Sequence, residues 1–282
     1  MPSPSSNPPS STAEGTTASH SPGIDIDRIT PTIRPEGRLV MYQNWRDLLF
    51  LHWPVPAEML RPLIPRELEL DLFEGTAYVG LIPFRMCGIR PVGLPAVPRL
   101  SRFCETNVRT YVHYKGQAPG VWFFSLDAAN ALAVRIARGW FHLPYHYSRM
   151  YLEHERPARG RTRDDLQELV EHPILYAGVR RYFEPIPASY VIRAQPVGLP
   201  KPAVPRTIEH FLVERYILYT QFRGKLFRGH VQHTPYPLQA AKLLSLSETM
   251  LTANDLNLAP AHPFAHFARG VNVKVFNLLP VL

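Results

Sequence analysis

Apolar and polar side chains alternate along several stretches of the chain, and this period of two is typical of β-strands. The clearest case is Glu105–Tyr114, with the sequence ETNVRTYVHY. One face of this predicted strand is mainly β-branched, whereas the other is polar and carries Glu105, Asn107, Arg109, Tyr111 and His113. By default such a face meets water in an antiparallel sheet, but in a closed barrel it would line a wet interior. The alternation alone leaves both interpretations open.

A different pattern covers Ser125–Tyr147, where it predicts the end of one strand, a helix and a second strand. Val121–Leu126 is apolar and aromatic, which favours a strand, and Asp127 follows as a candidate N-cap. Ala128–Arg138 has the apolar spacing of a helix, and Gly139 suits the left-handed position that ends one. The next segment, WFHLPYHY, is rich in aromatic residues and histidine. We expect it to be either packed core or the wall of a polar pocket.

Two β-hairpins are predicted further along the chain. The first joins Gly178–Phe183 to Ser189–Gln195, and the second joins Glu214–Phe222 to Leu226–His233. A short helix with Thr207 as its N-cap is predicted between them. Strands therefore dominate. We expect an α+β protein that is mainly antiparallel β, arranged as a sheet or barrel with a few short helices.

The first 37 residues differ in composition from the rest of the chain. They are rich in Pro, Ser and Thr and have almost no large apolar residue before Ile24. Such a segment cannot bury enough apolar surface to offset the entropy lost on ordering. We therefore expect a disordered tail over residues 1–37 and a single domain over residues 38–282.

Composition and charge argue against several classes of function. The net charge is +8, but there are only five lysines and no basic run interleaved with aromatic residues, so no nucleic-acid partner is expected. The two cysteines, Cys87 and Cys104, lack CxxC spacing and indicate neither a disulfide framework nor a thiolate zinc site. No apolar run has transmembrane length, and the N-terminus lacks the pattern of a signal peptide. We expect a cytoplasmic protein without a membrane partner.

Histidine is the residue type most suggestive of a metal site, but its spacing argues against one. His142 and His146 have the separation of a helical metal pair with Pro144 between them, and His230 and His233 would point to opposite faces of a strand. No HExxH motif, P-loop, GxSxG motif or dinucleotide fingerprint is present. We expect no metal and no cofactor, unless the fold brings distant ligands together.

Eight sequence blocks occur in one order between Tyr42 and Phe276: WRDLLFLHWPVP, LRPLIPRELELD, YVGLIPFRM, ETNVRTYV, FFSLDAANALAV, FHLPY, ERYILYT and HFARGVNV. In these blocks the chain resembles the YqjF-like family of uncharacterised bacterial proteins and, more remotely, acetoacetate decarboxylase. The resemblance implies a closed, mainly antiparallel β-barrel around an internal cavity, assembled into homo-oligomers. It therefore favours an interior position for the polar face of Glu105–Tyr114.

Carried over by position, the resemblance to the decarboxylase is incomplete. Arg46 matches an arginine near the start of that enzyme's domain, and Glu105 matches one of its pocket glutamates. Its second glutamate falls at about Gly80, and its Schiff-base lysine and neighbouring lysine fall at Pro144-Tyr145-His146. Without an amine there, the iminium that accepts electrons in the decarboxylase cannot form. Schiff-base decarboxylation of acetoacetate is therefore not expected.

What remains is a candidate pocket for a small-molecule ligand. A guanidinium can hold a carboxylate through two hydrogen bonds. A buried glutamate has a raised pKa and can act as a general acid, and tyrosine or histidine can polarise a carbonyl or move a proton. We assign catalytic roles to Glu105, Tyr145 and His146, and substrate-binding roles to Arg46, Arg109 and His142.

Three functions stay open at this point. The first is an enzyme that performs lyase, hydratase or enolisation chemistry on a small oxo or hydroxy acid without a Schiff-base lysine. The second is a barrel that binds a small molecule, with carboxylic acids as the first class to test, and performs no catalysis. The third is a structural protein whose interior is filled by aromatic side chains.

Overall fold

The computed structural model of this chain describes residues 26–33, 35, 37–98, 100–155, 172–181 and 186–282. Within these ranges no helix is both long and apolar enough to cross a membrane. Most of the tail predicted over residues 1–37 lies outside the described residues. The described part corrects the predicted boundary, because Arg28 donates two hydrogen bonds to Asp71, of 2.9 and 2.7 Å, and Pro31 is buried. Chain that packs on the domain therefore begins before Arg38.

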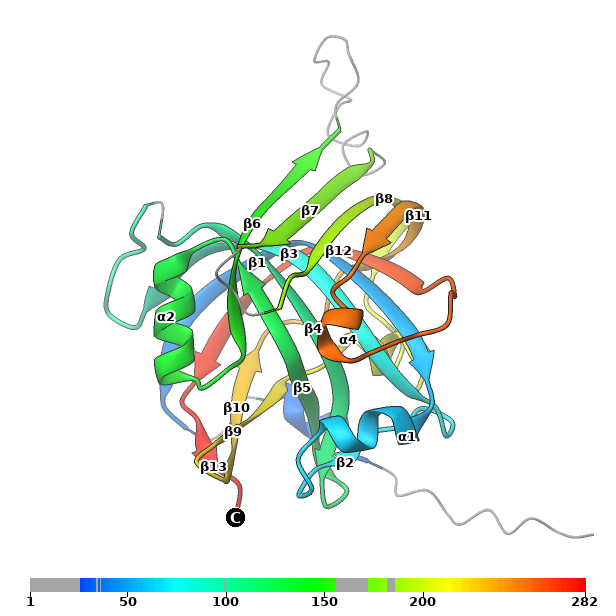
Figure 1. Ribbon diagram of the computed structural model, residues 1–282. Coiled ribbons are helices and arrows are strands. Elements are labelled where there is room, and N and C mark those ends of the chain that lie inside the picture. The colour runs from blue at the N-terminus through cyan, green and yellow to red at the C-terminus, as the bar shows by residue number, and fades with distance from the viewer. Residues whose placement is uncertain (1–25, 34, 36, 99, 156–171, 182–185) are drawn as a thin grey trace, which may run out of the picture.

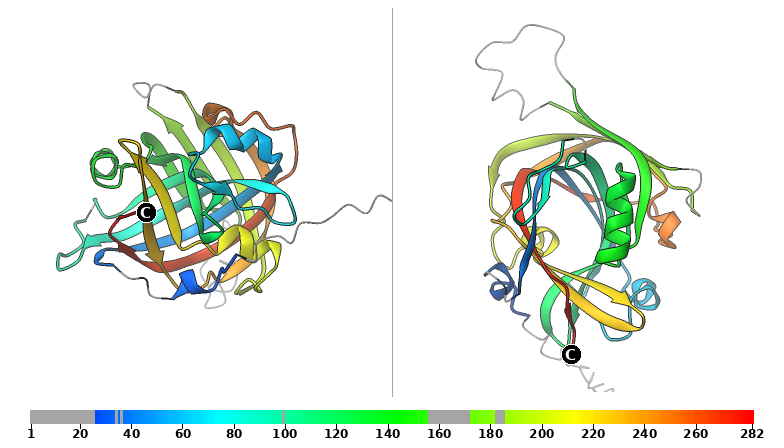
Figure 2. Two further views of the ribbon diagram at one scale, coloured as in Figure 1. Left: turned by 90° about the horizontal axis from the view of Figure 1, so that it is seen from below. Right: turned by 90° about the vertical axis from the view of Figure 1, so that its left-hand side faces the viewer.

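Thirteen strands in the described residues form one sheet, which is mainly antiparallel (Figures 1 and 2). Their order is β13-β10-β9-β5-β6-β7-β8-β11-β12-β1-β3-β4-β2, and the further pairings β5–β4 and β10–β12 join strands that lie apart in this order. The strands are β1 (Leu39–Val55), β2 (Glu69–Leu70), β3 (Ala77–Pro91), β4 (Phe103–Tyr114), β5 (Gln117–Ala128), β6 (Tyr145–His154), β7 (Ile174–Arg180), β8 (Ser189–Lys201), β9 (Ile217–Phe222), β10 (Lys225–Gln232), β11 (Leu238–Glu248), β12 (Phe264–Phe276) and β13 (Leu279–Pro280). The expected class, α+β with mainly antiparallel β-structure, is confirmed.

Short helices accompany the sheet in the described part of the chain. α1 (Ala57–Leu60) and α4 (Ile208–Val213) are brief, whereas α2 (Ala131–Trp140) has ten residues. Thr207 is the N-cap of α4, as predicted, and its side chain accepts a hydrogen bond from the amide of His210. Single 3-10 turns occupy Thr30–Thr32, Arg61–Leu63 and Thr252–Asn254. Both predicted hairpins are present, as β7–β8 and β9–β10.

The predicted strand–helix–strand unit is β5–α2–β6, but both ends of its helix differ from the prediction. β5 continues to Ala128, and Asp127, the predicted cap, is part of that strand. The N-cap is Asn130, whose side-chain oxygen accepts hydrogen bonds from two amides of the first turn. Gly139 lies inside the helix, and the left-handed residue that follows is His142, with a φ of 52°.

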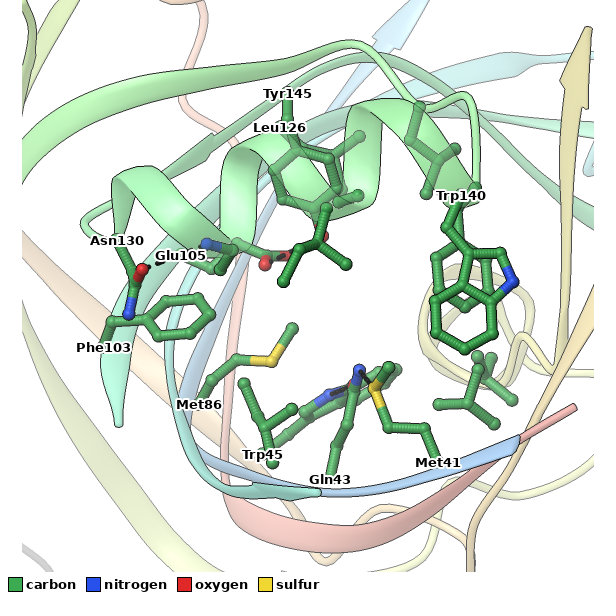
Figure 3. Close-up of a pocket in the computed structure, with 18 of the residues that line it drawn as sticks. Met41, Gln43, Trp45, Met86, Phe103, Glu105, Leu126, Asn130, Trp140 and Tyr145 are labelled. Carbon is green, nitrogen blue, oxygen red and sulfur yellow. Dashed lines mark hydrogen bonds between the residues drawn. The ribbon is translucent and has the colours of Figure 1, made fainter. Parts of the chain in front are cut away.

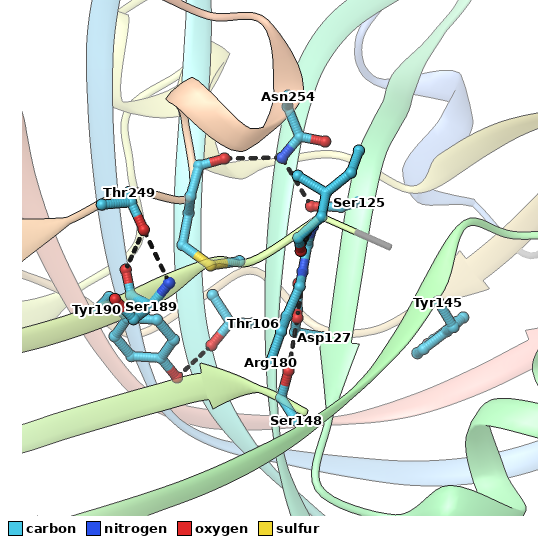
Figure 4. Close-up of polar contacts among 12 residues, drawn as sticks. Thr106, Ser125, Asp127, Tyr145, Ser148, Arg180, Ser189, Tyr190, Thr249 and Asn254 are labelled. Carbon is cyan, nitrogen blue, oxygen red and sulfur yellow. Dashed lines mark hydrogen bonds and ion pairs between the residues drawn. The ribbon is translucent and has the colours of Figure 1, made fainter. Parts of the chain in front are cut away.

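Asp127 belongs to a buried polar network between β5, β6 and β7 (Figure 4). Its carboxylate accepts hydrogen bonds from Ser148 Oγ at 2.6 Å and from Arg180 Nε and Nη2 at 2.8 and 3.0 Å. The side chains of Asp127 and Arg180 are each 1% exposed. A buried carboxylate needs partners of this kind. Arg180 therefore supplies the hydrogen-bond donors that the first amides of a helix would give to a capping Asp127. The strand continues through Asp127 instead.

Strand β4 has a buried apolar cluster on each of its faces. Val108 packs in one cluster with residues such as Leu49 and Leu81. Tyr111 packs in the other cluster, with residues such as Phe50 and Phe211. The cavity described next opens on the Tyr111 side of the strand, so β4 separates the cavity from solid core.

Candidate functional site

A cavity of about 520 Å³ lies inside the curved sheet, beside helix α2 (Figure 3). Its walls come from β1, β3, β4, β5, β6, β9, β10, β12, α2, the connection from β3 to β4 and the residues just before β9 and β11. Most lining side chains are apolar, and a few polar groups interrupt them, as is usual for small-molecule sites. The lining polar side chains include Gln43, Glu105, Arg109, Asn130, Tyr145 and Arg215.

The polar face of β4 points into the interior. All five of its predicted residues are buried: Glu105, Asn107, Arg109, Tyr111 and His113. The default expectation that this face meets water is therefore wrong, because β3 and β5 pair with β4 on either side and the sheet curves around it. From this face, Phe103, Glu105 and Arg109 line the cavity.

Glu105 and Tyr145 form a hydrogen-bonded pair at the α2 side of the cavity (Figure 3). Tyr145 Oη donates to Glu105 Oε2 at 3.0 Å, and Glu105 is 3% exposed. Burial raises the pKa of Glu105 from 4.5 to about 8, although the hydrogen bond from Tyr145 opposes this rise. Burial also raises the pKa of Tyr145, and the nearby Glu105 adds to the effect. Glu105 is therefore mostly a neutral acid at pH 7.

Strand pairing brings these two side chains together. Glu105 of β4 is paired with Ala128 of β5, while Leu126 of β5 is paired in parallel with Tyr145 of β6. Parallel neighbours need a crossover connection, and α2 supplies it. The helix thus places Tyr145 on β6, which is separated from β4 only by β5, and its hydroxyl reaches Glu105.

Arg109 is a buried cation of the cavity wall. It is 8% exposed, its Nη2 donates to the carbonyl of Leu212 at 3.3 Å, and its Nε has no hydrogen-bond partner in the described structure. No carboxylate among the described residues forms an ion pair with it. Its guanidinium instead lies 5.9 Å from the ring centroid of Phe50 and 5.7 Å from that of Tyr111. A buried cation without an anion is costly, so the Arg109 guanidinium is able to pair with an anion.

A second arginine of the wall, Arg215, lies against the same tyrosine as Arg109. Its guanidinium is 4.7 Å from the ring centroid of Tyr111. Arg215 Nη1 donates to Asp71 at 2.6 Å, and Nη2 is buried without a partner. Burial lowers the pKa of Arg215, and Asp71 partly offsets that effect. Because Asp71 also binds Arg28, one carboxylate serves two cations, and the local charge is positive.

Arg46 does not belong to the cavity, which corrects its assignment as a carboxylate ligand. Its neighbours Gln43 and Trp45 line the cavity, and successive side chains of a strand alternate in direction. The Arg46 guanidinium donates instead to the carbonyls of Trp45 and Val271 and to the side chain of Asn272. It therefore holds β1 to β12 on the outer side of the sheet.

His142 and His146 also lie outside the cavity lining, contrary to their assigned roles. The His142 ring stacks on Phe222, with 3.7 Å between centroids and 4° between planes. It lines a second pocket together with Trp122. His146 follows Tyr145 in β6, so it points to the other face of the strand. Of the six assigned residues, Glu105, Tyr145 and Arg109 reach the cavity.

Sequence reasoning missed Arg215, Tyr236 and Gln43, which also line the cavity. Gln43 accepts a hydrogen bond from Trp45 Nε1 at 2.9 Å. The signal for Arg215 was present in the block ERYILYT, where an acidic and a basic residue precede an apolar strand. Charges at such a place need buried partners. Glu214 has them, because it accepts from Tyr216 Oη and from the amide of Tyr236.

No lysine lines this cavity. All five, Lys115, Lys201, Lys225, Lys242 and Lys274, are exposed and none lines it. Among the described residues, no group of three or more His, Cys, Asp or Glu side chains is placed to hold a metal ion. The ionisable side chains of the wall are thus a neutral acid, two phenols and two guanidiniums.

Comparison with known proteins assigns the chain to a family. Residues 42–272 match the family model DUF2071, described as an uncharacterized conserved protein. The chain belongs to this family. The Uncharacterized protein YqjF of Bacillus subtilis (strain 168) is 37% identical to this chain over 244 residues, which are 86% of this chain and 93% of that protein. The resemblance to YqjF-like proteins is confirmed.

Solved structures show that this DUF2071 protein has an acetoacetate decarboxylase-like fold. The enduracididine biosynthesis enzyme MppR, complexed with pyruvate, matches with a TM-score of 0.58 and 10% identity, over 87% of this chain and 91% of that one. An acetoacetate decarboxylase-like enzyme from Sphingomonas wittichii RW1 matches with a TM-score of 0.58 and 12% identity, over 87% and 94%. The acetoacetate decarboxylase of Legionella pneumophila matches with a TM-score of 0.53 and 13% identity, over 90% and 94%. At these identities the likeness concerns the fold.

Proposed function

We propose that this DUF2071 protein binds a small oxo or hydroxy acid in the cavity and acts on it by acid–base chemistry without a Schiff-base lysine. We also propose that the sheet closes into a barrel around this cavity. The pairings β5–β4 and β10–β12 support closure, because they connect strands that would otherwise be far apart. The observation that carries the functional proposal is Arg109, a buried guanidinium that has no carboxylate partner among the described residues.

A ligand carboxylate at Arg109 would supply the missing anion. The unpartnered Nε of Arg109 and Nη2 of Arg215 are donors that such a group would satisfy, and charge-assisted hydrogen bonds of this kind are stronger than neutral ones. Tyr111 lies against both guanidiniums and offers them an aromatic wall. The pyruvate complex of MppR, a protein with the same fold, supports an oxo acid as the class of ligand.

The acid–base step would take place at Glu105, near the start of β4. With a pKa of about 8, Glu105 holds its proton at pH 7. Its Oε2 already accepts from Tyr145, so the other oxygen would carry the proton and donate it to a ligand carbonyl or hydroxyl. Protonation of a carbonyl oxygen acidifies the adjacent C–H bond, and the Glu105 carboxylate left by this transfer would accept the proton lost from that carbon, which gives the enol and restores the neutral acid. Tyr145, which gives its only hydroxyl proton to Glu105, would orient this acid, and its oxygen would accept a hydrogen bond from a hydroxy ligand.

The separation of these two ends limits the shape of the ligand. Glu105 and Arg109 are four residues apart on one strand, so their backbones are roughly 13 Å apart. The cavity wall as a whole is mainly apolar, with Phe103, Phe123 and Val121 among its residues. The ligand would therefore have a carboxylate at one end, an oxo or hydroxy group at the other, and an apolar middle.

The position of the lysines supports chemistry without an iminium. All five are exposed and outside the cavity, whereas a nucleophilic lysine must be desolvated to lose its proton at neutral pH. Proton transfer by Glu105 needs no such amine. A cytoplasmic location and assembly into homo-oligomers stay predictions.

Binding without catalysis is the second candidate, and the Glu105–Tyr145 hydrogen bond favours it. The two groups satisfy one another at 3.0 Å, so they could hold a ligand oxygen without exchanging a proton with carbon. Deuterium exchange distinguishes the two functions. An enzyme incorporates solvent deuterium next to the oxo group of the bound acid, whereas a binding protein does not.

A thermal-shift screen tests the proposed function. Linear and aromatic oxo and hydroxy acids of increasing length are compared with their amides, because a ligand that binds the native state raises its unfolding temperature. We expect acids of intermediate length to stabilise the wild type and their amides to do so much less. Arg109→Gln should abolish the shift, and the control Arg46→Gln should retain it. Equal shifts with acids and amides, or a shift that survives Arg109→Gln, would contradict a carboxylate site.

NMR of the best ligand in deuterated buffer then tests catalysis. Exchange that is present in the wild type and lost in Glu105→Gln would establish Glu105 as the proton donor. Saturable binding with no exchange above the uncatalysed rate would leave the binding function in its place.

A further inference from the structure

Tyr236 differs from the other deeply buried tyrosines in having no partner for its hydroxyl group. Six tyrosines in the described part of the chain are at most 3% exposed. Five of their hydroxyls form hydrogen bonds of 2.5–3.0 Å with protein groups, whereas that of Tyr236 forms none with a described residue. Buried tyrosine hydroxyls usually have a partner, and an exception needs an explanation. The five bonded tyrosines are Tyr111, Tyr176, Tyr190, Tyr216 and Tyr219.

The explanation is the position of Tyr236 at the Arg109 end of the cavity. Tyr236 lines the cavity. Burial raises the pKa of its phenol, and the Arg109 guanidinium opposes this rise because it lies near the hydroxyl. Phe50 contacts both side chains, since its ring centroid is 5.2 Å from that of Tyr236 and 5.9 Å from the Arg109 guanidinium. The free hydroxyl and the free cation therefore belong to the same part of the wall.

Tyr236 is held in place by groups other than its hydroxyl. Its amide donates to Glu214 Oε1 at 2.9 Å, and its ring centroid is 4.6 Å from that of His233. Pro235 and Pro237 flank it in the sequence and restrict the backbone on both sides. The hydroxyl is thus fixed in position before any ligand binds, which lowers the entropy cost of a bond to a ligand.

Arg109 also keeps donors that no protein group uses. Its Nη2 donates to the carbonyl of Leu212, but neither Nη1 nor Nε forms a hydrogen bond with a described residue. We propose that Tyr236 is a ligand-binding residue, which donates a hydrogen bond from its hydroxyl to the carboxylate held by Arg109. This inference rests on the proposed function and adds the residue that shares the carboxylate with the guanidinium.

Sharing of this kind makes the site selective for an acid. An ionised carboxylate has two oxygens that only accept hydrogen bonds, so one can face Arg109 while the other faces Tyr236. An amide in the same place has one oxygen and one NH2 group, and the NH2 group would face one of the two donors. The Tyr236 hydroxyl therefore contributes to the discrimination between an acid and its amide.

Titration calorimetry with two acids and their amides tests this role. The probes are 7-oxooctanoate and 4-acetylbenzoate, which each have a carboxylate at one end, a ketone near the other and an apolar middle. Tyr236→Phe should weaken binding of the acids by about tenfold or more, because hydrogen bonds to charged groups are the stronger ones. It should change binding of the amides much less, so the ratio of acid to amide affinity should fall.

Tyr176→Phe is the matched control. The Tyr176 hydroxyl donates to the carbonyl of Asp47 at 3.0 Å, and Tyr176 lines neither pocket. This variant should bind the acids like the wild type. Without ligand the two variants should differ in the opposite way. Tyr176→Phe should lower the urea midpoint, because a buried carbonyl loses its donor, whereas Tyr236→Phe should keep or raise it, because it removes no hydrogen bond to a described residue.

Three results would overturn the proposal, and they can be told apart. Equal lowering of the urea midpoint in the two variants would show that the Tyr236 hydroxyl is already bound within the protein. Acid binding that is lost in Arg109→Gln but unchanged in Tyr236→Phe would leave the carboxylate site intact and remove Tyr236 from it. If neither acid binds the wild type, the proposed carboxylate site itself fails, and the role of Tyr236 fails with it.

Discussion

Replacing Glu105 by glutamine should change how the stability of the protein depends on pH. In the fold the pKa of Glu105 is about 8, compared with an ordinary value of 4.5, chiefly because burial disfavours the carboxylate. A group whose folded pKa is raised gives its full stabilisation below the unfolded pKa and loses it as the pH rises through the folded pKa. Relative to Glu105→Gln, the wild type should therefore become progressively less stable between about pH 4.5 and pH 8.

The size of this effect follows from the two pKa values. Each unit of difference corresponds to about 1.36 kcal/mol. Between pH 5 and pH 9 the wild type should lose roughly 4 kcal/mol of unfolding free energy relative to the variant, as an order of magnitude. Glutamine has nearly the same shape and can still accept the hydrogen bond from Tyr145, so the variant should keep the fold.

Urea unfolding at pH 5, 7 and 9, followed by tryptophan fluorescence and circular dichroism, measures this difference. Glu69→Gln is the matched control, because Glu69 is an exposed glutamate of strand β2. It removes a carboxyl group without changing a buried site, and its difference from the wild type should stay constant with pH. If the wild type and Glu105→Gln kept a constant difference over this range, Glu105 would be ionised in the fold at neutral pH. It could not then be the proton donor.

Three further substitutions test neighbouring parts of the structure. Tyr145→Phe removes the hydrogen bond that lowers the pKa of Glu105. In a Tyr145→Phe background the pH-dependent loss of stability caused by Glu105 should therefore extend to higher pH than in the wild type, and the same urea series, with Tyr145→Phe/Glu105→Gln as reference, measures this. Asp127→Asn breaks the buried pair with Arg180 and should cost about 3–5 kcal/mol, whereas Glu155→Gln, in an exposed pair with Arg193, should change the urea midpoint little. Arg109→Gln should leave the unfolding free energy at pH 7 nearly unchanged or increase it, because it removes a cation that has no carboxylate partner among the described residues. A loss as large as that of Asp127→Asn would show that the charge of Arg109 is already balanced by an anionic group of the protein.

The alternation in Glu105–Tyr114 predicted which side chains share a face, but not where that face points. Its period of two depends on local geometry, and β4 follows it from Phe103 to Tyr114. Whether the polar face meets water depends on the curvature of the whole sheet, through pairings such as β5 with β4. No local pattern contains that information. The resemblance to a barrel family gave the better prediction here.

The misplaced residues show how sensitive a strand is to a shift of one position. Arg46 was carried over by sequence position, yet the side chains that enter the cavity are those of Gln43 and Trp45. Moving by one residue reverses the face. The same rule separates Tyr145, which lines the cavity, from His146, which does not. Matching a family by position therefore located the right strands more reliably than the right side chains.

The helix boundary was missed for a different reason. Asp127 and Asn130 are both good N-cap residues, and the local sequence does not distinguish them. The structure places Asp127 in β5 because Arg180, which is 53 residues away in sequence, binds its carboxylate. Long-range contacts of this kind also explain why Arg215 could not be predicted from the local sequence, since its partner Asp71 is 144 residues away. The charged groups that define the cavity are thus among those that a local pattern describes least well.

A crystal structure with the acid that gives the largest thermal shift would test the proposed site most directly. We expect the ligand to occupy the cavity, with its carboxylate hydrogen-bonded to Arg109 and its oxo or hydroxy oxygen within hydrogen-bonding distance of Glu105 or Tyr145. A ligand bound with its carboxylate toward Glu105, or bound at Arg46 on the outer side of the sheet, would contradict the assignment of both ends of the cavity.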